Sequence, residues 1–363
     1  MPRHLMMGTQ RSVLTAAFVC AVLTGAARAQ QPRHLPVFEG TYGAGLAEHA
    51  RFGREFGARF AATIGARFNA SATLSGALLP WVRSGAPAAR EAYAGFLAAH
   101  EAAFPEFVAE LRGLADGAGL PFDAVLVQNL REEFGDAYNR AAAEALDGGA
   151  PLPPITPRAD HCSDVLLWPL DAHNEDSDAG DLGHAVLVRA RVDGRSFWAF
   201  TYAGDLPSGA FGVALDAGIG FTLNYVHPEG ASAPPPAPGV GGGWIGRGFV
   251  SRDLLRAESL DDALARAARA DIASGHNYQL LQAAAPLDGA GGSGGRPARL
   301  LNLEVAPLGV SALAEFFEGD AAWFHANEYQ ASRPFSLHAG FSHPPDRVAQ
   351  RAIFFGRFIL FFG

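Results

Sequence analysis

The sequence predicts an α+β protein in which a helical N-terminal part precedes a part rich in strands. Apolar residues recur with helical spacing over residues 46–130, and after Cys162 they alternate with a period of two. A further helical stretch, residues 249–270, separates the early strand-like runs from the later ones. Helices, strands, helices and strands in this order are typical of a layered α+β architecture.

The first thirty residues have the pattern of a secretory signal peptide. Arg3 and Arg11 precede an apolar run over residues 14–26, and Ala27-Arg28-Ala29 resembles a cleavage site. The run is shorter than a bilayer span, which argues against an uncleaved anchor. An organelle transit peptide is the other alternative. We expect cleavage near Ala29, which makes residues 1–29 the signal peptide and the mature chain secreted or periplasmic.

Charge and hydropathy argue against two kinds of partner. The chain has a formal net charge of −9 and no cluster of Lys or Arg, so we expect no nucleic-acid partner. After residue 29 no apolar run is long enough to cross a membrane, so we expect no membrane span in the mature chain. With 49% apolar residues, the chain can build a large core in one or two domains.

The helical stretch divides into three expected helices. In the first, apolar side chains recur every four positions and predict one buried stripe: Phe52, Phe56, Phe60 and Ile64. The second has Pro105 near its start and Gly119 at its end, as helices prefer. The third is expected over residues 121–134. The following residues 141–159 are rich in Ala, Gly and Pro and predict an exposed linker.

After this linker, runs of alternating or β-branched residues predict strands at 165–168, 185–192, 196–202, 220–225, 278–284, 300–305 and 323–325. Residues 231–243 are rich in Pro and Gly and predict a loop. Within the helical stretch 249–270, Ser259 is followed by Asp261 and Asp262. This pattern predicts an N-cap and an acidic first turn.

Cys162 is the one cysteine expected in the mature chain, because the other, Cys20, lies in the signal peptide. It therefore has no partner for an intramolecular disulfide. A lone cysteine is either an inert buried thiol, which is the commoner case, or a nucleophile. If the His161–Cys162 bond breaks, Cys162 gains an α-amine with a pKa of about 7.7–8.0, suited to act as the base for its own thiol.

Three histidines near this cysteine could suggest a metal site: His161, His173 and His184. Their spacing matches neither H-x-x-x-H nor H-E-x-x-H, and a single thiol is a poor basis for structural zinc. We therefore expect no metal site and no other cofactor.

A set of sequence blocks occurs in a recognisable order over about residues 40–351: Glu110–Ala118, Asn129–Glu133, Cys162-Ser163, Asn174-Glu175-Asp176, Asn224-Tyr225, Gly275–Tyr278, Leu303-Glu304 and His325-Ala326-Asn327. In this set the chain resembles the acyl-CoA:6-aminopenicillanate acyltransferase family of N-terminal-nucleophile (Ntn) hydrolases. That family includes the β-alanyl-dopamine (carcinine) hydrolases. Each block alone is weak, and the ordered set is more specific.

The resemblance implies a four-layer αββα sandwich and a self-cleaving cysteine hydrolase. Cleavage between His161 and Cys162 would give a mainly helical small subunit, residues 30–161, and a catalytic subunit, residues 162–363, paired as a heterodimer. By position, Cys162 is the nucleophile, Asp176 supports its amine and Asn327 contributes to the oxyanion hole. Three further residues would support the site or line its pocket: Asn174, Glu175 and Asn224.

Each of these residues also has a plain structural interpretation. Asp176 alone would be a turn residue before the strand 185–192, and Asn327 alone is also typical of a turn. His325, beside Asn327, is interpreted as a structural histidine without a catalytic role.

The block His173-Asn174-Glu175-Asp176 is closer to the G-H-x-E-D of the aminoacyl-amine hydrolases than to the N-W-D of the penicillin enzyme. It favours hydrolysis of a small N-acyl or aminoacyl amide through a thioester on Cys162. An acyltransferase that uses an acyl-CoA-type donor is the first alternative, although coenzyme A is mainly intracellular. The second alternative is an inactive secreted member of the family with a binding role.

The sequence departs from the family pattern in three places. His161 stands where the family usually has Gly, and the P-D-S-x-x-R-x-x-R block lacks its Ser in residues 345–351. The sequence also stops at Gly363, where the family continues with a helix and a final pair of strands. We therefore expect the last core strands to be missing and interpret residues 354–362 as a helix cut short or an incorrect end of the chain.

Overall fold

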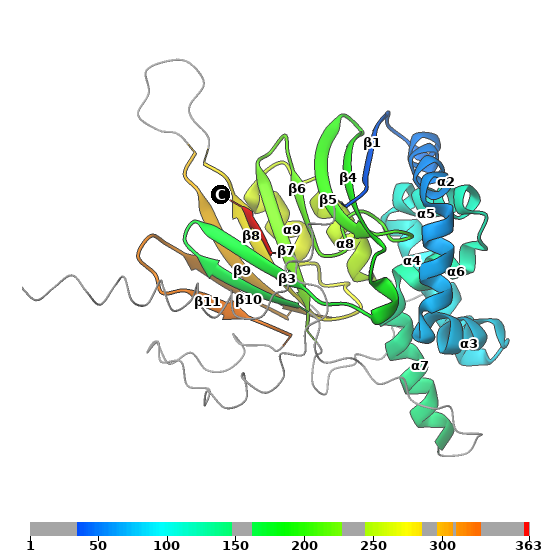
Figure 1. The fold of residues 1–363 in the computed structure, drawn as a ribbon. Coiled ribbons are helices and arrows are strands. Elements are labelled where there is room, and N and C mark those ends of the chain that lie inside the picture. Colours follow the sequence, from blue (N-terminus) through cyan, green and yellow to red (C-terminus); the bar gives the residue numbers. More distant parts are fainter. Residues whose placement is uncertain are drawn as a thin grey trace, which may run out of the picture. The chain divides into compact units, whose positions relative to one another are not determined.

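The computed structural model describes residues 35–146, 162–226, 244–284, 296–307, 310–327 and 359–362. In these residues the chain is a mixed α+β protein, with helices concentrated before Cys162 and a large mixed sheet after it (Figure 1). The predicted fold class is confirmed at this level. The expected signal peptide, the expected cleavage-site residue His161 and the predicted loop 231–243 lie outside the described residues.

The N-terminal part consists of one strand and a series of helices: β1 (Val37–Tyr42), α2 (Leu46–Ala70), the π-helix η1 (Leu74–Leu78), α3 (Leu79–Arg83), α4 (Pro87–Ala103), α5 (Pro105–Ala118), α6 (Phe122–Asn129) and α7 (Arg131–Leu146). The aromatic stripe of α2 is buried as predicted. Gly119 ends α5 in the left-handed conformation, with φ 67°, which glycine adopts without strain.

Two boundaries in this part were predicted wrongly. The helix expected over residues 121–134 is two helices, because Leu130 leaves helical geometry with φ −123° and ψ 33°. The second of them, α7, continues to Leu146, into the stretch expected to be a linker from Ala141. The Ala-rich end of α7 is a good helix former, and this local preference extends the helix past the expected boundary.

A close crossing of α2 and α5 organises the helical part. A Cβ on Gly53 would lie 1.9 Å from the carbonyl oxygen of Glu110, and a Cβ on Gly113 would lie 2.0 Å from that of Ala50. Gly57 and Gly117, one turn further along each helix, are equally constrained. The two backbones pack this closely because no side chain stands between them.

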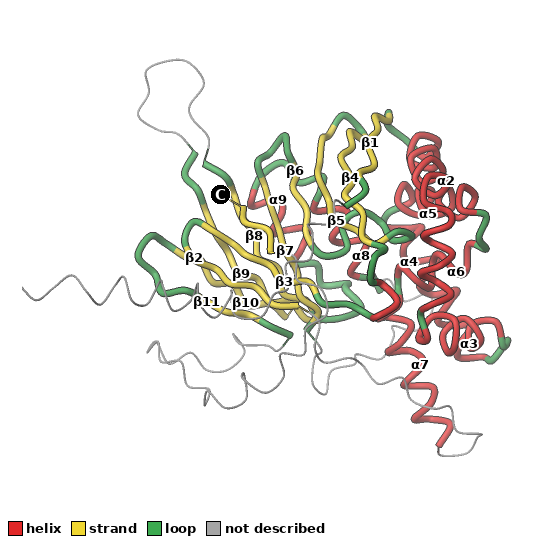
Figure 2. Tube along the Cα trace, in the orientation of Figure 1, coloured by secondary structure: helices red, strands yellow, loops and turns green. Residues whose placement is uncertain are grey.

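Two sheets follow. The larger has eight strands in the order β1-β4-β5-β6-β7-β8-β9-β10, and the smaller has four in the order β11-β2-β3-β12 (Figure 2). Their bounds are β2 (Cys162–Leu167), β3 (Leu170–Glu175), β4 (Ala185–Val192), β5 (Arg195–Tyr202), β6 (Phe211–Ala214), β7 (Ile219–Tyr225), β8 (His276–Gln282), β9 (Arg299–Ala306), β10 (Val310–Phe316), β11 (Trp323–His325) and β12 (Ile359–Phe362). A short 3-10 helix, η2 (Ala179–Asp181), follows β3.

The strands expected from the alternation pattern are present, and others were missed. β1 adds to the large sheet by pairing in parallel with β4, although residues 30–161 were expected to be mainly helical. β12 pairs antiparallel with β3. Residues 359–362 are therefore a strand of the small sheet, and their interpretation as part of a truncated helix is wrong. Three of the four residues, Ile359, Phe361 and Phe362, have high strand propensity.

The stretch 249–270 forms the expected pair of helices, α8 (Arg247–Leu254) and α9 (Leu260–Ala267). Ser259 caps α9 as predicted, since its hydroxyl accepts a hydrogen bond from the backbone N–H of Asp262 over 3.1 Å. Both helices pack on one face of the large sheet, where their apolar residues share a core with Phe221 and Leu223 of β7.

The opposite face of the large sheet meets the small sheet. Thr222 of β7 donates to Asp171 of β3 over 3.0 Å, and Asn224 donates to Asp164 of β2 over 2.7 Å. The described residues thus form a helical layer, the large sheet and the small sheet. The second helical layer of the expected four-layer sandwich does not occur among them.

Candidate active site around Cys162

The hairpin of β2 and β3 builds the candidate site. In its antiparallel register Cys162 lies opposite Glu175, and Asp164 lies opposite His173. Residues two apart in a strand share a face, so these four side chains project from the same side of the small sheet. That side faces the large sheet, and Cys162, Asp164 and His173 are buried there.

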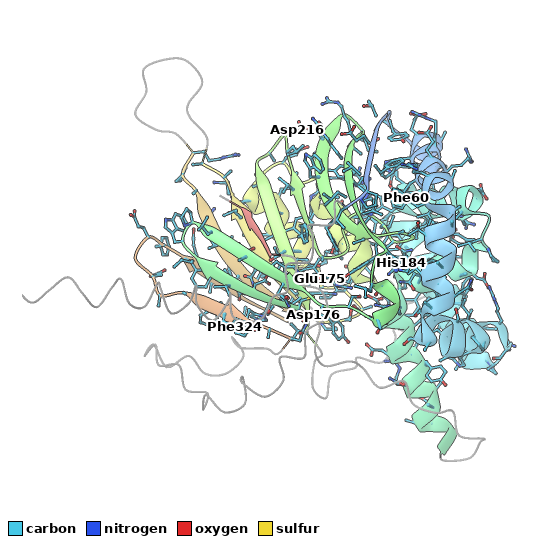
Figure 3. All side chains as sticks on the ribbon, viewed as in Figure 1. Phe60, Glu175, Asp176, His184, Asp216 and Phe324 are labelled. Carbon is cyan, nitrogen blue, oxygen red and sulfur yellow. The ribbon has the colours of Figure 1, made fainter. Side chains whose placement is uncertain are left out.

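The Cys162 thiol lies against two neighbours from the end of β3. Its Sγ is 3.1 Å from Oε2 of Glu175 and 3.9 Å from the backbone carbonyl oxygen of Asp176. Figure 3 marks Glu175 and Asp176 at this end of the strand. Cys162 retains 8% of its accessible surface, so the thiol is largely shielded from water.

His173 lies between Glu175, which contacts the thiol, and a second carboxylate, that of Asp164. Its Nε2 is 3.1 Å from Oε2 of Glu175, the same oxygen that the thiol contacts, and its Nδ1 is 2.6 Å from Oδ1 of Asp164. Burial opposes the imidazolium charge, but the Asp164 carboxylate, together with the hydrogen bonds to Cys162 and Glu175, outweighs burial and raises the pKa of His173 well above its usual value.

The thiol itself is held in its neutral form. Burial and then the charge of Glu175 raise the pKa of Cys162 to about 12, while contact with His173 acts in the opposite direction. At neutral pH the arrangement is therefore a thiol beside an imidazolium that lies between two carboxylates. Such a thiol reacts as a nucleophile only when a base removes its proton.

Asn327 accepts a hydrogen bond from the backbone nitrogen of Cys162. The N–H of Cys162 donates to Oδ1 of Asn327 over 3.0 Å, and Nδ2 of Asn327 donates to the carbonyl of Tyr225 over 2.7 Å. The register explains the contact: β11 pairs with β2 through His325 and Asp164, and continuing that ladder brings residue 327 opposite residue 162. In this arrangement the amide group that an oxyanion hole would need donates to Tyr225.

The other expected site residues, Asn174 and Asn224, bond to polar groups around the thiol. Nδ2 of Asn174 donates to the carboxylate of Asp176 over 2.9 Å, and Asn224 holds Asp164, as described above. The structure thus brings Glu175, Asp176 and Asn327 into direct contact with Cys162. Asn174 contacts Asp176, whereas Asn224 contacts Asp164, the carboxylate behind His173.

Sequence reasoning gave no role to His173, Asp164 or Tyr202. His173 entered only the rejected metal motif and the family block of residues 173–176, and Asp164 was given no role. A usable signal was present, because Cys162 and Asp164 are two apart in one run, as are His173 and Glu175 in the next. Pairing the two runs as a hairpin would have placed all four on one face.

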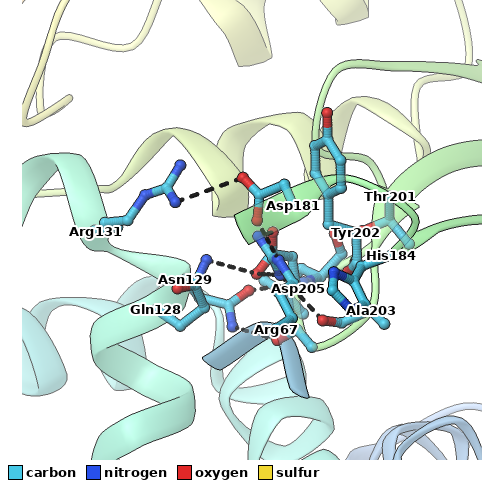
Figure 4. A network of polar contacts seen from close by, with 12 residues as sticks. Arg67, Gln128, Asn129, Arg131, Asp181, His184, Thr201, Tyr202, Ala203 and Asp205 are labelled. Carbon is cyan, nitrogen blue, oxygen red and sulfur yellow. Dashed lines mark hydrogen bonds and ion pairs between the residues drawn. The ribbon is translucent and has the colours of Figure 1, made fainter. Parts of the chain in front are cut away.

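Tyr202 fixes the other oxygen of Glu175. Its hydroxyl donates to Oε1 over 3.1 Å, and the guanidinium carbon of Arg67 lies 5.1 Å from the centroid of its ring. Arg67 is fully buried and pairs with Asp181 at 2.6 Å and with Asp205 at 2.8 Å (Figure 4). These pairs attach the loops after β3 and β5 to the end of α2.

The block Asn129–Glu133 contributes to the same anchoring. Arg131 pairs with Asp178 at 2.9 Å, and the side chain of Asn129 accepts from the N–H of Leu206 over 2.7 Å. Both bonds join the segment before Cys162 to loops of the segment after it. Two covalently separate segments would remain held together by such partly buried polar contacts.

Glu133, at the end of that block, is buried below the start of α8. Its Oε1 accepts from the backbone N–H of Arg247 over 2.9 Å, and Glu132 pairs with the side chain of Arg247 at 2.9 Å. Burial, and then the adjacent Glu132 charge, raise the pKa of Glu133 to about 7. It is an interior acid that titrates near neutral pH.

One group of side chains among the described residues could hold a metal ion: Cys162, His173 and Glu175, whose ligand atoms all lie within 4.8 Å of one another. The search for H-x-x-x-H spacing missed this group because strand pairing, and not helical spacing, brings its members together.

Comparison with models of known protein families and with curated proteins finds no match to this chain. Within the described residues, no helix is both long enough and apolar enough to cross a lipid bilayer.

Proposed function

We propose that the chain is a self-processing Ntn cysteine amidohydrolase, similar to the penicillin acyltransferase and carcinine hydrolase family, that cleaves a small N-acyl or aminoacyl amide. One observation carries the proposal: at Cys162, the first residue of β2, the backbone nitrogen and the sulfur each have a polar neighbour. Its nitrogen contacts Asn327 and its sulfur contacts Glu175. An N-terminal nucleophile needs a neighbour at each of these atoms.

In the intact chain Cys162 has no free α-amine, so another group must take the thiol proton. Glu175 is at hydrogen-bond distance and takes that role in our proposal. The sulfur then attacks the carbonyl carbon of His161, and the C–N bond to Cys162 breaks as the nitrogen gains a proton. Water hydrolyses the resulting thioester, which releases the His161 carboxylate and regenerates the thiol.

In the cleaved protein the new α-amine becomes the base, and Asp176 supports it. The thiolate attacks the acyl carbonyl of the amide substrate, and the leaving amine takes a proton from the α-ammonium of Cys162. Water then hydrolyses the acyl thioester to the free acid. The amide group of Asn327 leaves the Tyr225 carbonyl, and it and a backbone N–H donate hydrogen bonds to the oxyanion. No cofactor takes part.

The proposed product is a secreted or periplasmic heterodimer of residues 30–161 and 162–363. The buried pairs of Arg67 with Asp181 and Asp205 support its persistence after cleavage, since they join the two segments. Separating the two segments would leave these buried charges unpaired or exposed to water, which costs free energy.

Intact-mass analysis of the purified protein and its Cys162→Ala variant tests the self-processing. We expect two fragments that meet at His161/Cys162 in the wild type and one uncleaved chain in the variant. A single uncleaved chain in both would refute the proposed mechanism. Cleavage elsewhere, or cleavage that persists in the variant, would show that another protease or residue acts.

The two alternatives predict different products. An acyltransferase would release free coenzyme A from an acyl-CoA donor, whereas a hydrolase would cleave amides without any donor. A binding protein would do neither and would remain unprocessed. A small panel of N-acyl and aminoacyl amides, assayed with and without acyl-CoA, separates these outcomes.

A further inference from the structure

We propose that Cys162, His173 and Glu175 form a binding site for one thiophilic divalent cation, of which Zn²⁺ is the best fit, and that the bound ion masks the thiol. The ligand atoms Sγ, Nε2 and Oε2 lie within 4.8 Å of one another. Oε2 is 3.1 Å from each of the other two. The inference concerns metal binding and does not require that the chain be an enzyme.

The spacing suits a small tetrahedral ion. Zn²⁺ binds sulfur at about 2.3 Å and nitrogen or oxygen at about 2.0–2.2 Å, which sets the atoms of a tetrahedral ligand set about 3.3–3.7 Å apart. The two observed contacts to Oε2 are slightly shorter, so these two pairs need only a small outward movement. The separation of Sγ and Nε2 is within 4.8 Å. A thiolate, an imidazole and a carboxylate are all ligands that Zn²⁺ accepts.

Second contacts already orient the ligands, which distinguishes the group from a chance cluster. Nδ1 of His173 lies 2.6 Å from Oδ1 of Asp164, and Asn224 holds the other oxygen of that carboxylate at 2.7 Å. Tyr202 fixes Oε1 of Glu175 at 3.1 Å and leaves Oε2 directed at the cluster. A carboxylate behind a ligating histidine is the usual outer contact in zinc sites.

The charge balance is also favourable. Both short contacts to Oε2 need a proton between the heavy atoms, one on sulfur and one on Nε2. A divalent cation at the centre replaces these two protons, so the net charge of the buried group does not change on binding. The interior therefore avoids the desolvation cost of an added, uncompensated charge.

Cobalt titration of the full chain tests the site directly. We would use the Cys20→Ser background, in which Cys162 is the sole thiol. We expect Co²⁺ to produce a thiolate-to-metal charge-transfer band that saturates at one equivalent and is abolished by added Zn²⁺. One equivalent of Zn²⁺ should also slow alkylation of Cys162 at least about tenfold.

Two ligand variants and one matched control identify the ligands. His173→Gln and Glu175→Gln should each weaken Co²⁺ binding at least about tenfold. His184→Gln, which changes a histidine whose ring bonds to the carbonyl of Gly180, should leave it unchanged. Circular dichroism confirms that each variant is folded.

Absence of the charge-transfer band, or a band unchanged in both ligand variants, would overturn the site. If a ligand variant fails to fold, the test rests on the alkylation of Cys162 in the Cys20→Ser protein. An alkylation rate that Zn²⁺ does not lower would contradict the proposal. Intact-mass analysis of the same samples reports cleavage separately, so a negative metal result and a failure of the proposed function are distinguishable.

Discussion

The backbone N–H of Cys162 donates a hydrogen bond to Oδ1 of Asn327 over 3.0 Å, across 165 positions of the chain. The contact depends on β11, which pairs with β2 and carries residue 327 past the end of its ladder to residue 162. If the His161–Cys162 bond is the scissile one, this nitrogen is its leaving group. Asn327 would then act on cleavage from the nitrogen side, in addition to the oxyanion role proposed for its amide group.

Substitutions at Asn327 separate these two roles. Asn327→Asp keeps an acceptor for the N–H of Cys162 and removes the amide donor, whereas Asn327→Ala removes both. If donation to the oxyanion matters, both variants should process themselves about 10²–10³-fold more slowly. The rate is followed by intact mass after synthesis. A normal rate in Asn327→Asp would assign the residue to the nitrogen alone.

Glu175→Gln should lower the pH at which the Cys162 thiol reacts. Burial and then the Glu175 charge raise the pKa of Cys162 to about 12, and the substitution removes the charge while keeping the shape. The pH dependence of alkylation in the Cys20→Ser background measures the effect. Tyr202→Phe, which removes the hydroxyl that contacts Oε1 and leaves the charge, is the control. An unchanged profile in Glu175→Gln would show that burial dominates.

Arg67→Met should destabilise the fold by about 3–5 kcal/mol, because it leaves Asp181 and Asp205 without their buried cation. Arg54→Met, on the same helix, is the matched control. Arg54 pairs with Asp116 at 3.6 Å with both side chains more than half exposed, so its loss should change stability by about 0.5 kcal/mol or less. Urea unfolding measures both, and equal effects would contradict the assignment.

Gly53→Ala should destabilise the crossing of α2 and α5 by about 1–3 kcal/mol, since the new Cβ would lie 1.9 Å from the carbonyl oxygen of Glu110. Gly65→Ala on the same helix meets no atom within 4 Å and should stabilise the protein by roughly 0.5–1 kcal/mol. Thermal unfolding gives both values. Gly53→Ala must lower the stability and Gly65→Ala must raise it, and changes of the same sign would contradict the prediction.

Stability should fall as pH rises towards 8 because of Glu133. Its pKa in the folded protein is raised to about 7, so the folded state favours the protonated form. The corresponding stabilisation is complete below the ordinary carboxyl pKa of about 4.3 and is lost as pH passes 7. Glu133→Gln should flatten the decline between pH 5 and pH 8 in urea unfolding. Parallel curves for the two proteins would count against this origin.

Local signals in the sequence predicted local structure well. The stripe of Phe52, Phe56 and Phe60 predicted a buried helix face, and Ser259 predicted an N-cap, because both depend on neighbours within one or two helical turns. β1 and β12 were missed for the opposite reason. Each is stabilised as a strand by a partner far away in the chain, and its own short segment does not identify that partner.

The candidate site divides in the same way. Counting cysteines and noting the position of Cys162 after a linker singled out one thiol, and the ordered blocks pointed to Glu175, Asp176 and Asn327. The sequence alone therefore singled out Cys162 as the candidate nucleophile and indicated the α+β class around it. Only the tertiary structure placed His173 and Asp164 beside that thiol and Asn327 at its nitrogen. The physical reason is register, since strand pairing converts residues distant in the chain into neighbours, and a shift of one position would turn them to the other face.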